Sequence, residues 1–88
     1  MEKSKELIDK LKLDFRLDRF KVKKLVERSD TLELAFILNK AQVTAFVCTF
    51  RKIGKEICLV ALYPLFESGF TYYDYIRQNV ELVNEEQK

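Results

Sequence analysis

The sequence has no histidine and no tryptophan, and it has only two glycines, two cysteines and one proline among 88 residues. Without histidine the chain has no Ser-His or Cys-His catalytic pair and no histidine-ligated metal. Two cysteines alone are too few for a structural zinc site. Gly54 and Gly69 lie far apart, so no phosphate-binding loop or dinucleotide fingerprint is present. We therefore expect no catalytic residue, no metal, no cofactor and no small-molecule substrate.

The composition is that of a folded chain, with 48% hydrophobic and 34% charged residues. A length of 88 residues corresponds to a single domain spanning residues 1–88. A domain of this size buries only about 60–65% of the surface that its unfolded chain exposes, so its stability is marginal. Association with a second copy or another protein is therefore expected from the size alone.

The compartment can be inferred from the first residues and from the apolar runs. Residues 1–10 alternate in charge and lack the apolar stretch of a secretory signal. The longest apolar run, residues 57–66, is about half the length that spans a bilayer. We expect a cytoplasmic protein that does not enter a membrane, with reduced cysteines.

The amino-terminal third gives conflicting signals. Ser4 is a good N-cap, and an apolar stripe predicts an amphipathic helix over residues 4–13. From Leu11 to Asp18 apolar and charged residues alternate, although the residue types favour a helix. A strand over residues 20–27 is our prediction, and one continuous helix to residue 27 is the alternative.

The rest of the chain predicts strands followed by a helix. Alternating apolar residues predict strands over residues 31–39, 43–51 and 56–63, and Pro64 ends the last of them. Thr71 and Asp74 have the spacing of a capping box and predict the start of a final helix. Its predicted buried stripe consists of Tyr73, Ile76, Val80 and Val83. The fold class is therefore α+β, with an N-terminal helix, an antiparallel meander of three or four strands and a C-terminal helix.

The turn between the last two strands determines how they pair. A two-residue type I′ turn at Ile53-Gly54 gives a β-branched residue a positive φ, which is sterically costly. We therefore predict a three-residue loop over residues 52–54, with Gly54 left-handed in a bulge. In this register Cys48 faces Cys58 across the hairpin. The two thiols are then a redox pair or, as we favour, two small buried hydrophobic side chains.

Both faces of this hairpin are apolar. One predicted face carries Phe46, Cys48, Phe50, Cys58, Val60 and Leu62, and the other carries Val43, Ala45, Val47, Ile57, Leu59, Ala61 and Tyr63. A sheet with one face in water has polar residues at alternate positions, so both faces should be covered. We therefore predict a homodimer, or a complex with another protein, through an apolar sheet face. The candidate interface residues are Phe46, Phe50, Val60 and Leu62, with Tyr72 and Tyr75 as aromatic anchors.

A basic stretch supports a second hypothesis, nucleic-acid binding. Residues 1–55 contain 14 Lys and Arg against 8 Asp and Glu, whereas residues 56–88 contain 2 against 6. Clustered cations of this kind are typical of a surface that binds a phosphate backbone. The candidate contacts are Arg16, Arg19, Lys21, Lys23, Lys24 and Arg28, with Arg51, Lys52 and Lys55 at the hairpin tip. The competing interpretation is a solvated face balanced by the acidic carboxyl-terminal third.

Enzymatic activity is not expected, because the carboxylates are scattered and form no spaced pair on one element. The order of a helix and an antiparallel sheet, with the hairpin from Phe50 to Tyr63, loosely resembles the small RelE-type ribonuclease toxins. That resemblance implies ribonuclease activity as a third hypothesis and assigns no residue. The leading expectation is a small non-enzymatic interaction protein, such as an adaptor, a chaperone-like protein or an inhibitor.

Overall fold

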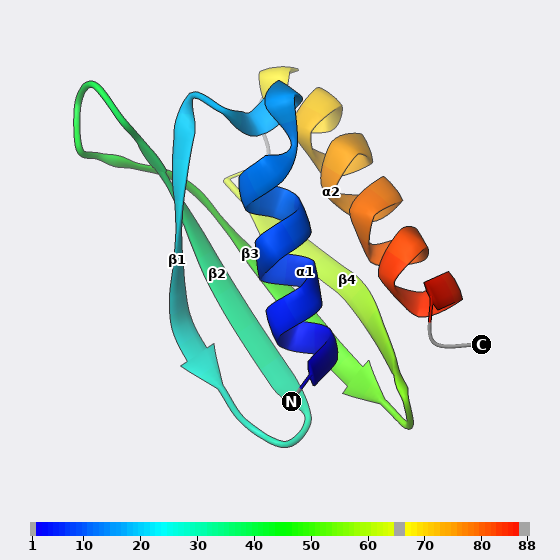
Figure 1. Cartoon of the computed structure of the whole chain (residues 1–88). Coiled ribbons are helices and arrows are strands. Elements are labelled where there is room, and N and C mark those ends of the chain that lie inside the picture. The colour runs from blue at the N-terminus through cyan, green and yellow to red at the C-terminus, as the bar shows by residue number, and fades with distance from the viewer. Residues whose placement is uncertain (1, 65–66, 87–88) are drawn as a thin grey trace.

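The chain forms one four-stranded antiparallel sheet with two helices on the same face (Figure 1). The computed structural model describes residues 2–64 and 67–86. The elements are α1 (Glu2–Leu13), a short 3-10 helix η1 (Phe15–Leu17), β1 (Phe20–Glu27), β2 (Thr31–Leu38), β3 (Thr44–Ile53), β4 (Glu56–Tyr63) and α2 (Glu67–Glu86). The strands lie in the sheet in chain order, each antiparallel to the next. The α+β prediction is confirmed, with four strands.

Asp14 determines the structure of the segment after α1, for which the sequence gives conflicting signals. Its backbone is extended, with φ −74° and ψ 112°, and its carboxylate accepts a hydrogen bond from the amide of Arg16. A side chain that bonds the backbone two residues later replaces the helical hydrogen-bond pattern. The chain therefore leaves α1 at Leu13 and enters β1 at Phe20. The predicted strand over residues 20–27 is confirmed, and the alternative of one helix to residue 27 is wrong.

Both predicted helix starts were placed too late. α1 begins at Glu2, so Ser4 lies inside the helix, where it is buried, rather than at its N-cap. α2 begins at Glu67, so Thr71 lies within the helix and does not open it. A capping residue marks a start only where the backbone before it is not helical. The buried stripe of α2 is nevertheless confirmed by Ile76, Val80 and Val83, each at most 4% exposed, whereas Tyr73, its fourth predicted member, is only partly buried.

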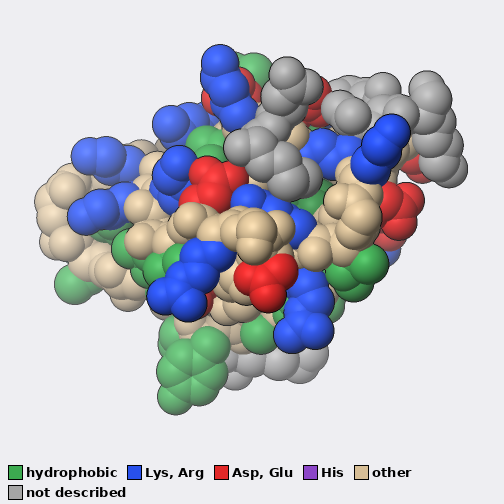
Figure 2. All heavy atoms as spheres, turned by 90° about the horizontal axis from the view of Figure 1, so that it is seen from below, with side chains coloured by type: hydrophobic (Ala, Val, Ile, Leu, Met, Phe, Trp, Pro, Cys, Tyr) green, Lys and Arg blue, Asp and Glu red, His purple; other side chains and the backbone are tan. Residues whose placement is uncertain are grey.

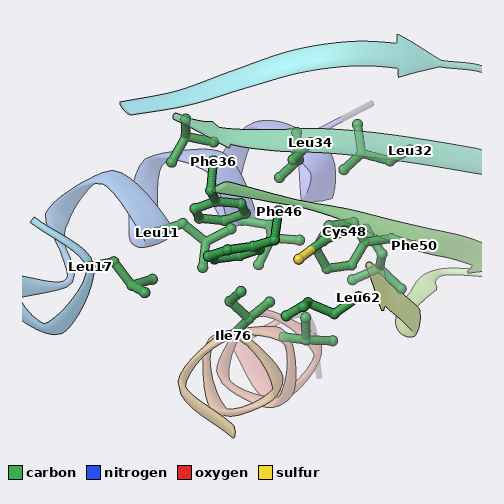
Figure 3. Packing of buried hydrophobic residues seen from close by; sticks show 14 of the residues in the cluster. Leu11, Leu17, Leu32, Leu34, Phe36, Phe46, Cys48, Phe50, Leu62 and Ile76 are labelled. Carbon is green, nitrogen blue, oxygen red and sulfur yellow. The ribbon is translucent and has the colours of Figure 1, made fainter. Parts of the chain in front are cut away.

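The core lies between the sheet and the helices (Figure 3). Alternate residues of the two central strands point toward the helices, and α1, η1 and α2 supply the other side of the core. The largest fully buried side chains are Leu7, Leu11, Leu17, Leu32, Leu34, Phe36, Phe46, Phe50, Ile57 and Ile76. Tyr72 extends this core because its ring stacks on Phe46 and meets Phe20 edge-on.

The predicted register of the β3–β4 hairpin is wrong. Ile53 pairs with Glu56, so the connecting turn is Gly54-Lys55. Gly54 has φ +60°, the conformation that a type II′ turn requires at its first central position. A bulge then shifts the pairing, so that Cys48 lies opposite Leu62. Cys48 consequently points into the core, whereas Cys58 points to the other face.

The two helices run antiparallel beside each other, so that the start of α1 and the end of α2 lie toward the same end of the molecule (Figure 1). The chain enters α1 and leaves α2 at this end, on the helix side of the sheet. Neither helix is long and apolar enough to cross a membrane over the described residues. The opposite face of the sheet is left without a covering helix in the described ranges 2–64 and 67–86.

Candidate functional site: the open face of the sheet

The open face consists of the strand positions that point away from the helices. They are Lys21, Lys23 and Val26 on β1, Thr31, Glu33, Ala35 and Ile37 on β2, Ala45, Val47, Thr49, Arg51 and Ile53 on β3, and Glu56, Cys58, Ala61 and Tyr63 on β4. The name open face is used below for this set.

The open face has an apolar half and a polar half. One cross-strand row contains Lys23, Ala35, Val47 and Tyr63, with Ile37 in the row above it. Tyr63 is 77% exposed, an unusual degree for an aromatic side chain on a sheet.

The next rows, toward the β3–β4 turn, are polar. Glu33 pairs with Thr49, and Thr31 pairs with Arg51, which in turn pairs with Cys58. The face therefore combines an apolar area with charges of both signs, a composition found in protein interfaces.

The two edges of the sheet are protected against pairing with another strand. The β1 edge carries Lys21, Lys23 and Lys24, all exposed, and charged lysines discourage strand addition. At the β4 edge the amide of Ile57 donates to Asn84 Oδ1 at 3.0 Å, and Asn84 Nδ2 donates to the Ile57 carbonyl at 2.9 Å. The bulge in β4 further interrupts that edge. The face is therefore a more accessible docking surface than either edge.

Most of the interface residues named from the sequence lie elsewhere. Phe46 and Phe50 are 0% exposed and Leu62 is 7% exposed, because all three point under the helices. The three share one face of the hairpin, as predicted, but that is the face that the helices cover. Tyr72 and Tyr75 are half-buried on the helix side.

Val60, the sixth of these residues, is 54% exposed at the bulge in β4. The predicted second face was partly right, since Val47 and Tyr63 do lie on the open face. Ile57, by contrast, is fully buried on the helix side. The bulge in β4 and the Gly54-Lys55 turn determine which β4 side chains face the helices. Hydrophobic alternation predicts the location of neither.

The cations of the basic stretch do not form one surface. Arg16 forms an ion pair with Asp14 at 2.8 Å and its guanidinium lies 4.4 Å from the ring centre of Tyr75. Arg19 donates to the hydroxyl of Tyr72 at 3.1 Å. Lys24 and Lys52 both form ion pairs with Glu27. Three of the candidate cations thus have carboxylate partners within the chain.

Lys52 is a buried structural residue rather than a surface cation. Its side chain is 4% exposed, and its ammonium donates to Glu27 at 3.0 Å and to the carbonyl of Arg28 at 2.6 Å. It thereby fixes the β1–β2 turn against β3. Hydrogen bonds from Lys24 and Lys52 lower the pKa of Glu27 from 4.5 to about 2.

A second polar cluster joins η1 to α2. Asn79 donates to Asp14 Oδ2 at 2.9 Å, and Arg16 also donates to Gln78 at 2.9 Å. The hydrogen bond from Arg16, with smaller contributions from Asn79, lowers the pKa of Asp14 to about 2. Sequence reasoning missed this cluster, since its members are more than sixty positions apart. No local pattern could have identified it.

The remaining candidate cations are spread over separate surfaces. Lys21 and Lys23 lie on the open face beside β2, and Arg51 lies on it between Thr31 and Cys58. Figure 2 shows the end of the molecule that carries the β1–β2 and β3–β4 turns, where Lys and Arg side chains are interspersed with Asp and Glu. Arg28 and Lys55 are exposed in those turns.

The two thiols differ in environment as well as in direction. Cys48 is fully buried, and burial raises the pKa of its thiol above the usual range. Cys58 is partly exposed on the open face. Both are free, and the predicted cross-strand proximity of the two sulfur atoms is wrong. Cys58 is therefore a native chemical probe of the open face.

Within the described ranges no group of three or more Cys, Asp and Glu side chains could hold a metal ion. No family model, no curated protein and no solved structure matches this chain. The geometry of the open face is thus the basis on which a function can be argued.

Proposed function

We propose that this chain is a small non-enzymatic interaction protein that forms a homodimer through the open face of its sheet. The observation that carries the proposal is the one-sided arrangement of the helices: they cover one face and leave the half-buried Val47 and the exposed Tyr63 accessible on the other. Apolar surface of this kind is stabilised when a partner removes it from water. Adaptor, chaperone-like and inhibitor roles are all consistent with such a module.

The size of the face favours a second copy over a larger partner. Four strands spaced about 4.8 Å apart, with about eight residues at roughly 3.3 Å each, give a face on the order of 500 Å². Two copies would bury about 1,000 Å², which is near the lower limit for a specific interface. We therefore expect a dimer that dissociates in the micromolar range, because the buried area is small and partly polar. The free thiols of Cys48 and Cys58 are consistent with a cytoplasmic location, which belongs to the same proposal.

Light scattering after size exclusion, at several protein concentrations, tests the proposal directly. The mass should rise from one chain toward two as the concentration increases. Ala61→Asp, at an exposed position on the open face, should keep the chain monomeric, because it places a carboxylate in the interface. Leu82→Asp, at a position on α2 that is 49% exposed, is the matched control and should leave the dimer intact.

Cys58 supplies a second measurement that needs no substitution. Its reaction with a thiol reagent should slow as the protein concentration rises, because dimerisation covers it. Cys48 should stay unreactive throughout. A monomeric mass at every concentration, with Cys58 reactivity unchanged, would contradict the proposal.

Nucleic-acid binding stays a separate prediction, resting on fewer cations than the sequence indicated. Lys21 and Lys23 would have to act with Arg28, Arg51 and Lys55, since Lys52 is buried in an ion pair. That hypothesis predicts binding to duplex or single-stranded probes that weakens steeply with salt.

A further inference from the structure

The charged side chains are distributed asymmetrically over the four strands of the open face. Glu33 lies on β2 and Arg51 lies on β3, one cross-strand row apart. Lys21 and Lys23 lie on β1, at one edge, whereas Tyr63 lies on β4, at the other. A second copy placed on this face therefore meets different charges according to how it is rotated.

Two aligned sheets can be related by a two-fold axis in two ways. The axis runs either along the strands or across them, because aligned sheets pack with their strands within about 30° of each other. An axis along the strands places β1 of one copy against β4 of the other, and β2 against β3. An axis across the strands places each strand against its own counterpart.

The charges favour the first arrangement. With the axis along the strands, Glu33 of one copy lies over Thr49 of the second copy, one row from its Arg51, and this diagonal contact occurs twice. Lys23 then lies over Tyr63 of the second copy, where an ammonium and an aromatic ring attract each other. With the axis across the strands, β1 lies against β1, so the exposed Lys21 and Lys23 of the two copies come together, which is repulsive. β2 then lies against β2 rather than β3, so Glu33 loses its contact with Arg51 of the second copy.

We infer that the partner of the open face is a second copy related by a two-fold axis parallel to the strands, with Glu33 paired with Arg51 across the interface. This inference rests on the proposed dimer and adds its geometry. In this arrangement different strands of the two copies face each other, and each contact between two residues occurs twice, as a two-fold interface requires.

The test uses two charge reversals measured alone and together. Glu33→Arg and Arg51→Glu should each weaken the dimer about tenfold or more, because each turns two attractive contacts into repulsive ones. A mixture of the two variants should dimerise about as well as the original chain, because every contact in the mixed dimer again joins opposite charges. Lys55→Glu, the same charge change in the exposed β3–β4 turn, is the matched control and should leave the dissociation constant unchanged.

Cross-linking gives an independent measurement of the same geometry. In a Cys58→Ser background, copies with Lys23→Cys and copies with Tyr63→Cys should be joined to each other by a short bis-maleimide reagent, which spans the roughly 10 Å between packed sheets, and neither should cross-link with itself. Dimers in which Arg51→Glu has no effect, or in which Lys23→Cys links to itself, would overturn the strand-parallel axis while leaving the proposed dimer standing. A monomeric mass for the unmodified chain would overturn both.

Discussion

Asn84 and Ile57 hold the last helix to the last strand through two reciprocal hydrogen bonds. The side-chain amide of Asn84 accepts from the Ile57 amide and donates to the Ile57 carbonyl, as a neighbouring strand would. One side chain thus satisfies both outward backbone groups of a buried residue in an edge strand. An unpaired buried backbone group costs about 1–3 kcal/mol, so this contact has a measurable contribution to stability.

Replacing Asn84 should therefore destabilise the fold and expose the β4 edge. We expect Asn84→Ala to lower the free energy of unfolding by about 1–2 kcal/mol. Asn84→Asp should cost at least as much, because a carboxylate has no N–H to donate and would repel the Ile57 carbonyl. Urea denaturation measures the loss of stability in both variants, and a sedimentation assay for aggregates measures the exposure of the β4 edge. Equal stability of Asn84→Ala and the original chain would contradict this role.

The buried pair of Lys52 and Glu27 should respond asymmetrically to substitution. Glu27→Gln leaves the Lys52 ammonium, 4% exposed, without its carboxylate, and we expect a loss of about 2–3 kcal/mol. Lys52→Met removes the buried charge and leaves Glu27 partly in water beside Lys24, so a loss of less than about 1 kcal/mol is expected. Chemical denaturation of the two variants at neutral pH measures the difference. A larger loss for Lys52→Met than for Glu27→Gln would contradict the account.

Acid should weaken the fold through two carboxyl groups. The pKa values of Asp14 and Glu27 are about 2 in the folded chain, against ordinary values of 3.8 and 4.5. Because both are lowered by folding, their stabilisation is complete above about pH 5 and is lost as the pH falls toward 2. For Glu27 this loss should be about 2–3 kcal/mol, as for Glu27→Gln, because both changes leave the Lys52 ammonium without a carboxylate.

Denaturation midpoints measured between neutral pH and pH 2 test this pH dependence. Asp14→Asn should be less stable at neutral pH and should lose less stability on acidification, since it no longer titrates. Asp9→Asn, the same change at an exposed position of α1, is the control and should follow the original curve. An Asp14→Asn curve parallel to the original one would argue against this assignment.

Tyr72 should act as a core residue rather than as an anchor for a partner. Its ring lies 5.5 Å from Phe46 and 5.0 Å from Phe20, between ring centres. Tyr72→Ala should lower stability by about 2–3 kcal/mol, while Tyr72→Phe, which loses only an exposed hydrogen bond to Arg19, should cost less than about 0.5 kcal/mol. Thermal unfolding measures both. Dimerisation of Tyr72→Phe should equal that of the original chain.

Alternation of apolar residues was sufficient to predict the strands and the class of the fold. It succeeded for β2 because Leu32, Leu34 and Phe36 all point toward the helices. It also placed Phe46, Cys48 and Phe50 of β3 on one face, but it failed at β4, where both faces are apolar and a shift of one residue exchanges them. The turn at Gly54-Lys55 and the bulge set that shift through backbone conformation. Hydrophobic patterning does not record such conformations.

The polar contacts were the least predictable part of the molecule. Lys52 in the hairpin and Arg16 after α1 look like surface cations in the sequence, because a charged residue is usually solvated. Their ion pairs depend on Glu27 and Asp14, whose positions are fixed only by the packing of distant elements, and only Lys52 is buried. The basic stretch therefore suggested a larger phosphate-binding surface than the fold provides.

The placement of the chain ends has a practical consequence. Since α1 starts and α2 finishes on the helix side, a dimer joined through its sheets would carry all its chain ends on its two outer surfaces. A fluorescent protein or an affinity tag attached at either end would extend from the helix layer and not from the joined sheet faces, so it would leave them undisturbed. The two fused proteins, one on each copy, would lie on opposite sides of the dimer. The two packed sheets and their helix layers would keep them apart.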